Sequence, residues 1–200
     1  QTGSGKSTQI PQYLLEVYHP YAKIICCQPR RVSAISIANR VSNELPDPKL
    51  SGYRIRGDSR THGNRTRIEF VTTGVVLAML QNGIESLGNV SHLLIDEVHE
   101  RGVEIDYLLT VLHEWLRKSS DDETIPPPPK IILMSATIDS TKFSEYFSNA
   151  PVSESCEQCS LSLSSSHTHT HTQAQTRSTH VYIGSQGLGT YVSGRYFILI

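Results

Sequence analysis

Four short apolar runs, separated by longer segments with helical spacing, constrain the fold of this chain most. The runs lie at 23–27, 68–71, 91–95 and 130–134. Each run ends at a polar or small residue, and apolar positions in the segments 34–45 and 105–116 recur with the period of an amphipathic helix. Strands and helices that alternate in this way predict an α/β fold with a mostly parallel sheet flanked by helices.

The composition suits one such domain with some chain to spare. The 200 residues have 38% apolar content and contain no apolar run long enough to span a membrane. Two of the four cysteines, Cys26 and Cys27, are adjacent in a strand-like run, so no secreted disulfide framework is indicated. We therefore expect a protein that works inside the cell, in the cytoplasm or the nucleus, without a membrane partner.

The first residues contain most of a phosphate-binding loop. Gly5, Lys6 and Ser7 match the end of the motif G-x-x-x-x-G-K-[ST]. In such a loop, backbone N–H groups at the start of a helix surround the phosphates of a nucleotide. The residues that we expect to bind the nucleotide here are Thr2, Gly3, Ser4, Gly5, Lys6, Ser7 and Thr8.

Lys6 and Ser7 have separate predicted tasks in this loop. Lys6 would neutralise the β- and γ-phosphate oxygens, and the Ser7 hydroxyl would bind Mg²⁺. Ile10, Leu14 and Val17 would anchor the following helix on the sheet. The first glycine of the motif would precede Gln1, so we expect the sheet to lack its first strand, the one that leads into the loop. Taken alone, the loop is also compatible with a chance glycine-rich turn.

A pair of carboxylates follows the apolar run 91–95. Asp96, at the predicted strand end, can hold Mg²⁺, and Glu97 can orient and deprotonate the water that attacks the γ-phosphate. Acidic residues after a strand are common on protein surfaces. Together with a phosphate-binding loop earlier in the same series of strands and helices, this pair predicts hydrolysis of ATP or another nucleoside triphosphate.

Several strings resemble the motifs of one helicase family. The string Asp96-Glu97-Val98-His99 resembles the signature of the DEAH-box RNA helicases, with Val98 in place of the usual alanine. Segments 28–34, 72–77 and 135–137 resemble the family's motifs Ia, Ib and III, in family order. Segments 7–12 and 35–41 are similar to the DEAH/RHA branch. The resemblance covers residues 1–152 and implies the first RecA-like, ATP-binding domain of an ATP-dependent RNA helicase.

The resemblance also implies roles for individual residues. Contacts to the sugar-phosphate backbone of single-stranded RNA, or of an RNA duplex with an overhang, would come from Arg30, Arg31, Thr72 and Thr73. His99 would couple the nucleotide site to Ser135 and Thr137, so the implied catalytic set is Lys6, Glu97, His99, Ser135 and Thr137. Residues 30–67 hold nine Lys or Arg against three acids, which suits a nucleic acid partner, although a solvated basic face is an alternative.

The family's motor also has a second RecA-like domain and C-terminal accessory domains. We expect this chain to be an incomplete copy of that motor, which hydrolyses ATP poorly by itself and whose activating protein partner the sequence does not identify. The alternative is a catalytically inactive fragment that binds nucleotide or RNA.

Residues 153–191 have a low-complexity composition rich in Ser, Thr and His. Thirteen of the 28 residues in 153–180 are Ser or Thr, which predicts disorder. The alternating Leu-Ser and His-Thr pairs are what CT and CA repeats encode, so one hypothesis is translated non-coding sequence. The alternative is zinc binding by Cys156, Cys159 and the nearby histidines. Segment 193–197 resembles a family strand, so we expect residues 192–200 to form a strand that resumes the family pattern.

Overall fold

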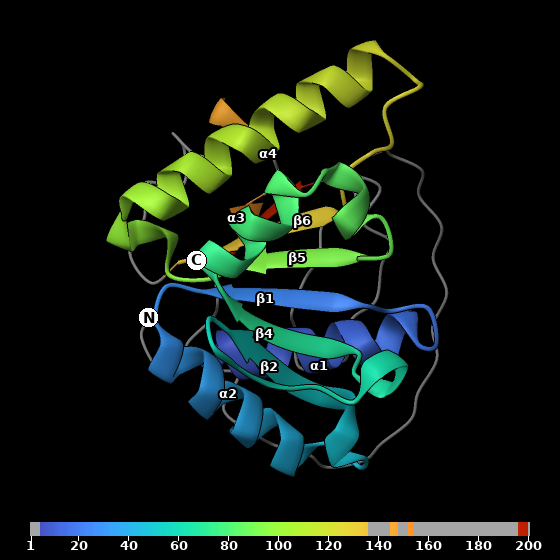
Figure 1. Ribbon diagram of the computed structural model, residues 1–200, viewed down its shortest axis with the longest axis vertical. Coiled ribbons are helices and arrows are strands. Elements are labelled where there is room, and N and C mark those ends of the chain that lie inside the picture. Colours follow the sequence, from blue (N-terminus) through green and yellow to red (C-terminus); the bar gives the residue numbers. More distant parts are fainter. Residues whose placement is uncertain (1–4, 136–144, 148–151, 154–195, 200) are drawn as a thin grey trace, which may run out of the picture.

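The computed structural model describes residues 5–135, 145–147, 152–153 and 196–199 (Figure 1). The strands in this part of the chain are β1 (Ile24–Gln28), β2 (Ser51–Ile55), β3 (Asp58–Arg60), β4 (Ile68–Thr72), β5 (His92–Ile95), β6 (Lys130–Met134), β7 (Val152–Ser153) and β8 (Tyr196–Leu199). The α-helices are α1 (Lys6–Tyr18), α2 (Arg31–Glu44), α3 (Thr73–Gln81) and α4 (Val103–Asp121). Short 3₁₀ turns are η1 (Pro48–Leu50), η2 (Gly63–Arg65), η3 (Ile84–Leu87) and η4 (Val98–Glu100).

The described strands form one sheet in the order β3-β2-β4-β1-β5-β6-β8-β7. All neighbouring pairs are parallel except β2 and β3, which are antiparallel. The four apolar runs of the sequence are β1, β4, β5 and β6, and the two segments with helical spacing lie in α2 and α4. The predicted α/β fold with a mostly parallel, helix-flanked sheet is therefore confirmed.

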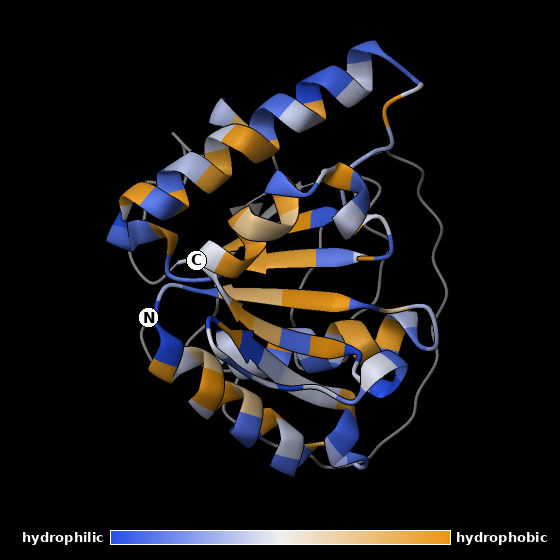
Figure 2. Ribbon diagram, viewed as in Figure 1, coloured by the Kyte–Doolittle hydropathy of each residue, from blue (hydrophilic) through white to orange (hydrophobic). Residues whose placement is uncertain are grey.

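The sheet separates two apolar cores, one on each face. Ile25 and Cys27 of β1 pack with residues of α3 and α4, whereas Ile24 and Cys26 pack with α1 and α2. Strands that are covered on both faces need apolar residues at successive positions, which explains the unbroken apolar runs in the sequence. Figure 2 shows these residues gathered on the central strands and on the helix faces turned toward them.

The buried face of α1 differs from the predicted one. Ile10 is buried and Leu14 is partly buried, as expected, but Val17 is 51% exposed and Leu15 takes its place in the core. The side chains of Pro11 and Leu15 face the sheet, whereas Val17, in the last turn of the helix, lies beyond the part of α1 that the core covers. The prediction that Val17 anchors the helix is therefore wrong.

Strands β2 and β3 form a hairpin at the edge of the sheet that the sequence analysis did not predict. Gly57 (φ +83) lies in its turn, and a Cβ added to Gly52 would lie 2.3 Å from the carbonyl oxygen of Arg60. A side chain at position 52 would therefore push the two strands apart. Arg54 of β2 pairs with the buried Glu69 of β4, and their Nε and Oε1 atoms are 2.6 Å apart.

Some predictions fall on residues that the structure does not describe. Outside the described ranges lie Thr2, Gly3, Ser4, Thr137, Cys156 and Cys159. Within the predicted segment 192–200, Tyr196–Leu199 is a strand that runs parallel to β6. Among the helices of the described part, none has the length and apolar content needed to cross a membrane.

Candidate active site

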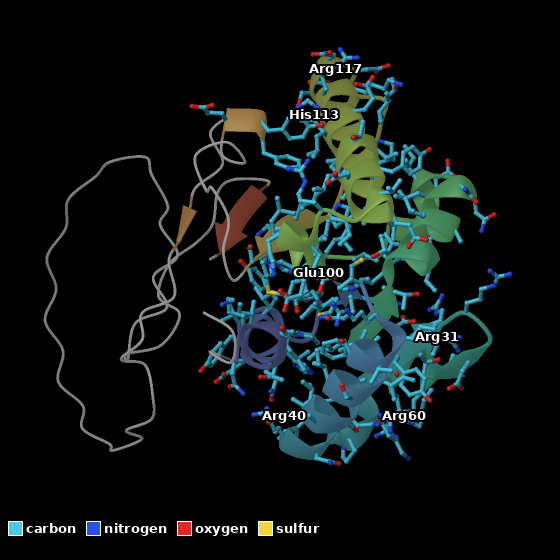
Figure 3. The ribbon with its side chains drawn as sticks, turned by 90° about the vertical axis from the view of Figure 1, so that its left-hand side faces the viewer. Arg31, Arg40, Arg60, Glu100, His113 and Arg117 are labelled. Carbon is cyan, nitrogen blue, oxygen red and sulfur yellow. The ribbon has the colours of Figure 1, made fainter. Side chains whose placement is uncertain are left out.

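The carboxyl ends of β1 and β5 lie side by side in the middle of the sheet. From β1 the chain continues into α2 on one face, and from β5 it continues toward α4 on the other face. In open α/β sheets, ligands bind where consecutive connections leave in opposite directions in this way. Figure 3 shows the molecule from the side on which these carboxyl ends lie, which we call the carboxyl edge of the sheet.

Gly5 and the first turn of α1 are the described end of the predicted phosphate-binding loop. Gly5 has a left-handed conformation (φ +79°), which favours glycine, and the helix begins at Lys6. The backbone N–H groups of Thr8 and Gln9 donate to the Gly5 carbonyl at 3.1 and 2.8 Å. Unpaired N–H groups and the dipole at the start of a helix favour a bound phosphate.

Hydrogen bonds from two distant parts of the chain and from the adjacent backbone meet at the carboxylate of Asp96. The Ser7 hydroxyl and the Gln28 side-chain amide both donate to Asp96 Oδ2, and the Gln28 Nε2 distance is 2.8 Å. The backbone N–H of Glu97 donates to Oδ1 at 2.9 Å. Asp96 is only 4% exposed, so each of these bonds matters to its position. The structure thus brings together Ser7 and Asp96, the two predicted metal ligands, across 89 residues of sequence.

The donor set at this point suits Mg²⁺. A serine hydroxyl and a carboxylate supply hard oxygen atoms, and Mg²⁺ is usually bound by one or two protein groups together with water and substrate phosphates. Among the described residues, no group of three or more His, Cys, Asp or Glu is arranged to hold a metal ion. A magnesium site in this part of the chain would therefore depend on phosphate oxygens as well as on Ser7 and Asp96.

Glu97 adjoins this carboxylate in a left-handed conformation (φ +53°). Burial raises the pKa of Glu97 above its usual value, and the negative charge of Asp96 raises it further. The Nδ1 atom of His99 lies 3.3 Å from Glu97 Oε2 and 3.3 Å from Ser135 Oγ. His99 thus joins the Glu97 loop to the end of β6, and a carboxylate with a raised pKa is a stronger base for a water molecule.

The four residues predicted to contact RNA lie at the same edge of the sheet but differ in exposure. Arg30 and Arg31 are exposed at the beginning of α2, and Thr72 is partly exposed at the end of β4. Thr73 is only 2% exposed, and its hydroxyl accepts a hydrogen bond from the Cys27 thiol at 3.5 Å. Burial raises the pKa of this thiol to about 12, which keeps the donor protonated. The Thr73 side chain therefore points into the core.

Arg30 is engaged in an ion pair with Glu100, with 2.9 Å between Nη2 and Oε1. Figure 3 shows Glu100 near the middle of this edge. Glu100 belongs to η4, the turn that directly follows Glu97. One predicted RNA contact is thus joined to the loop that carries a predicted catalytic residue.

The basic stretch 30–67 is partly neutralised inside the chain. Four of its nine basic residues form ion pairs: Arg30 with Glu100, Arg40 with Glu44, Arg54 with Glu69, and Arg65 with Asp47. Glu44 and Asp47 lie within the stretch and are already counted among its three acids. Only the pairs with Glu69 and Glu100 therefore reduce the surplus of positive charge that the folded surface presents to a nucleic acid.

Sequence reasoning assigned no task to Gln28 or Glu100. Cys27 of β1 pairs with Ile95 of β5. Gln28 follows Cys27 and Asp96 follows Ile95, so the two polar residues occupy equivalent positions on neighbouring strands. The rule that selected Asp96, a polar residue at the carboxyl end of a buried strand, applies equally to Gln28 and could have found it.

Comparisons with known proteins agree with this arrangement. Residues 1–145 match the family model described as DEAD/DEAH box helicase. The ATP-dependent RNA helicase DHX29 of Homo sapiens is 48% identical over 166 residues, which cover 76% of this chain and 11% of that protein. DExH-box ATP-dependent RNA helicase DExH1 of Arabidopsis thaliana is 45% identical over 158 residues, and ATP-dependent DNA/RNA helicase DHX36 of Mus musculus is 42% identical over 161 residues. Each of these two matches covers 76% of this chain and 15% of the relative.

Proposed function

We propose a function from one premise: this chain belongs to the DEAD/DEAH box helicase family. It spans 11% to 15% of the relatives named above, which are called ATP-dependent helicases. We propose that the chain is the nucleotide-hydrolysing part of an RNA helicase motor. In this proposal it binds ATP or another nucleoside triphosphate with Mg²⁺ and couples hydrolysis to movement along RNA.

The contact between the Ser7 hydroxyl and the Asp96 carboxylate carries this proposal. It joins the beginning of α1 to the end of β5, and Glu97 follows at the next position. Packing alone would not require a buried carboxylate at the end of a central strand, because an apolar residue would avoid the cost of burying a charge. A phosphate-binding turn, a cation-binding pair and a base together form the parts of a triphosphate-hydrolysing site.

Each residue of the site has a proposed role in hydrolysis. Lys6 neutralises the phosphate oxygens, while Ser7 and Asp96 hold Mg²⁺. Bound Mg²⁺ offsets negative charge on those oxygens. Glu97 accepts a proton from a water molecule whose oxygen forms a bond to the γ-phosphorus, and the bond from that phosphorus to the β–γ bridging oxygen breaks. His99 holds Glu97 relative to β6 through Ser135.

The proposed RNA contacts are Arg30, Arg31 and Thr72, which lie along one edge. They would bind sugars and phosphates of a single strand, or of a duplex with an overhang, without selecting bases. The Thr73 side chain is left out because it is buried. An RNA phosphate that binds Arg30 competes with Glu100 for this side chain, which couples RNA to the loop of Glu97. An RNA substrate places this activity in the cytoplasm or the nucleus.

RNA-stimulated ATP hydrolysis tests the proposal. We expect single-stranded RNA such as poly(U) to raise turnover, and Lys6→Ala and Glu97→Gln to lower it by about 100-fold or more. The matched controls are Lys118→Ala near the end of α4 and Glu16→Gln on the exposed side of α1, which should retain turnover within about twofold. Normal hydrolysis by both site variants would contradict the proposal. Nucleotide binding by the wild type without turnover would support the inactive, nucleotide-binding fragment instead.

A further inference from the structure

Gln28 is a buried polar residue that the proposed reaction has not yet used. It ends β1, follows four apolar or thiol side chains, and is only 2% exposed. Burying a carboxamide is unfavourable unless its hydrogen bonds are made. Its Nε2 atom donates to Asp96 Oδ2 at 2.8 Å, so the amide is hydrogen-bonded to the carboxylate of the proposed cation site.

The two oxygens of Asp96 are held by different donors. Oδ1 accepts the backbone N–H of Glu97, whereas Oδ2 accepts both the Gln28 amide and the Ser7 hydroxyl. This arrangement prevents the carboxylate from rotating about its Cβ–Cγ bond. Both oxygens are therefore fixed in space before any ligand arrives.

The position of Asp96 Oδ2 in turn sets the direction of the Ser7 hydroxyl. A serine hydroxyl has one proton and two lone pairs. When Ser7 donates its proton to Asp96, the lone pairs of Ser7 turn away from the carboxylate and become available to a cation. A Ser7 hydroxyl that rotated freely would point its proton toward the cation in part of the population and weaken binding.

A polar side chain that only completes the fold typically bonds to backbone groups. Ser91, at the opposite end of the neighbouring strand, bonds to the backbone N–H and carbonyl of Lys23 and so completes the sheet. The Gln28 amide donates instead to a side chain, and that side chain is one of the two proposed magnesium ligands. Groups that orient a metal ligand in this way typically change metal affinity by 10- to 100-fold when they are removed.

We propose that Gln28 is a positioning residue that orients Asp96 and Ser7 toward a divalent cation bound with the nucleotide phosphates. This inference rests on the proposed function. It adds to it a residue that acts through Asp96, and through Asp96 on Ser7.

A magnesium titration of nucleotide binding tests this role. Binding of a fluorescent ATP analogue to the 200-residue chain is measured with increasing Mg²⁺ and, separately, in EDTA. Gln28→Met keeps the length of the side chain but removes the donor. We expect it to raise the Mg²⁺ concentration at half-saturation about 10-fold. Affinity for the nucleotide in EDTA should stay within about twofold of wild type, because the Gln28 amide donates to Asp96 and not to the described part of the phosphate loop, residues 5–8.

The matched control is Gln12→Met on α1. Gln12 also donates its amide to a carboxylate, that of Glu44 at 2.7 Å, and to the backbone carbonyl of Thr8 at 2.9 Å, but neither of these bonds goes to Asp96 or to the Ser7 hydroxyl. It should leave the Mg²⁺ dependence unchanged. If Gln28→Met does not give a folded protein, as judged by its thermal unfolding transition, Gln28→Asn takes its place. Asn keeps a donor but shortens its reach, and we expect it to raise the half-saturating Mg²⁺ concentration severalfold.

The outcomes separate this proposal from the function on which it rests. An unchanged Mg²⁺ requirement in the Gln28 variants would overturn the positioning role while leaving the proposed function intact. So would an equal loss of nucleotide affinity with Mg²⁺ and in EDTA, because that result indicates general damage. If the wild-type chain binds the analogue equally well with and without Mg²⁺, the proposed function fails and the role of Gln28 fails with it.

Discussion

Polar side chains are buried at both ends of the parallel sheet, and the two ends use them for different purposes. At the amino ends, the Ser91 hydroxyl bonds to the backbone of Lys23, and His92 Nδ1 lies 3.0 Å from that hydroxyl. The His92 ring packs against Tyr18, with 4.7 Å between ring centroids. At the carboxyl ends, Ser7, Gln28 and the backbone of Glu97 all converge on Asp96.

The difference lies in what the hydrogen bonds accomplish. The amino-end contacts satisfy backbone groups and a histidine that would otherwise be unpaired, so they complete the fold. The carboxyl-end contacts concentrate donors on a buried negative charge that the fold does not need. Burial of polar groups therefore does not distinguish a candidate site by itself, and what sets the carboxyl end apart is that Ser7 and Gln28, distant in sequence, donate to one carboxylate.

Removing the charge at the carboxyl end should abolish chemistry. We expect Asp96→Asn to lower RNA-stimulated ATP turnover by about 100-fold or more, because the proposed cation site loses its only carboxylate. His92→Gln, at the amino end, should leave turnover within about twofold. Both rates are measured at saturating ATP and Mg²⁺ after the folded state of each variant is checked. Equal losses in the two variants would erase the distinction between the ends.

The amino end should instead govern stability in mild acid. Burial lowers the pKa of His92 to about 4, and the charge of Lys130 contributes to the shift. The unfolded chain, with a histidine pKa near 6.5, binds a proton that the folded chain excludes, so stability falls as the pH drops from about 6.5 toward 4. Between pH 7 and pH 5 this loss is about 2 kcal/mol in the free energy of unfolding. Urea denaturation at both values measures it.

The variant His92→Gln isolates this contribution from that of other titrating groups. Carboxylates and other histidines change the stability of both proteins alike, so only the difference between wild type and variant reports on His92. We expect the variant to lose less stability between pH 7 and pH 5 than wild type does. A loss of the same size in both proteins would show that His92 is not the group responsible.

The ion pair between Arg30 and Glu100 should have a smaller effect at the carboxyl end. It is largely exposed, and such pairs contribute roughly 0.2–1 kcal/mol. Glu100→Gln releases Arg30 for a phosphate, so we expect single-stranded RNA to bind up to about fivefold more tightly at low salt. Glu114→Gln, which removes an acid paired with Arg117 on α4, controls for the change in net charge. Equal tightening in both variants would argue against competition for Arg30.

The pH dependence of turnover should show the smallest change. Burial and the charge of Asp96 raise the pKa of Glu97. As the solution is acidified, turnover should therefore begin to fall at a higher pH than it would with an ordinary glutamate as the base. The nearby His99 opposes this shift and lowers the pKa of Glu97. His99→Gln should therefore move the acid limb of kcat/KM to still higher pH, whatever its effect on the rate. A limb that stays in place would exclude Glu97 as the titrating base.

The features that sequence reasoning found depend on neighbours along the chain. The apolar runs and the order of Lys6, Asp96 and Glu97 are local patterns, and the periodicity of strands and helices converts them into places at one edge of a sheet. The resemblance to helicase motifs extended this to the family, which the comparisons confirm. The assigned tasks of the individual site residues remain proposals.

The features that it missed depend on contacts between distant residues. The hairpin of β2 and β3 was not predicted, because a charged residue such as Arg54 does not by itself indicate a strand. Its ion pair with Glu69 of β4 becomes apparent only in the folded sheet. The motif string gave Thr72 and Thr73 the same role, but α3 begins at Thr73 and turns its side chain into the core. Gln28 could be placed at a strand end from sequence, but only the folded sheet shows that it touches Asp96.

Two residues without glycine's freedom, Glu97 and Arg101, bracket η4 in left-handed conformations. Such a conformation costs an L-residue about 1 kcal/mol or more, which glycine would largely avoid. At position 97 glycine would also remove the proposed base. The glutamate at position 97 therefore has a backbone cost, which the proposed use of its carboxylate in hydrolysis would explain. We therefore expect a related chain that does not hydrolyse nucleotide to accept glycine at position 97 while it keeps the same fold.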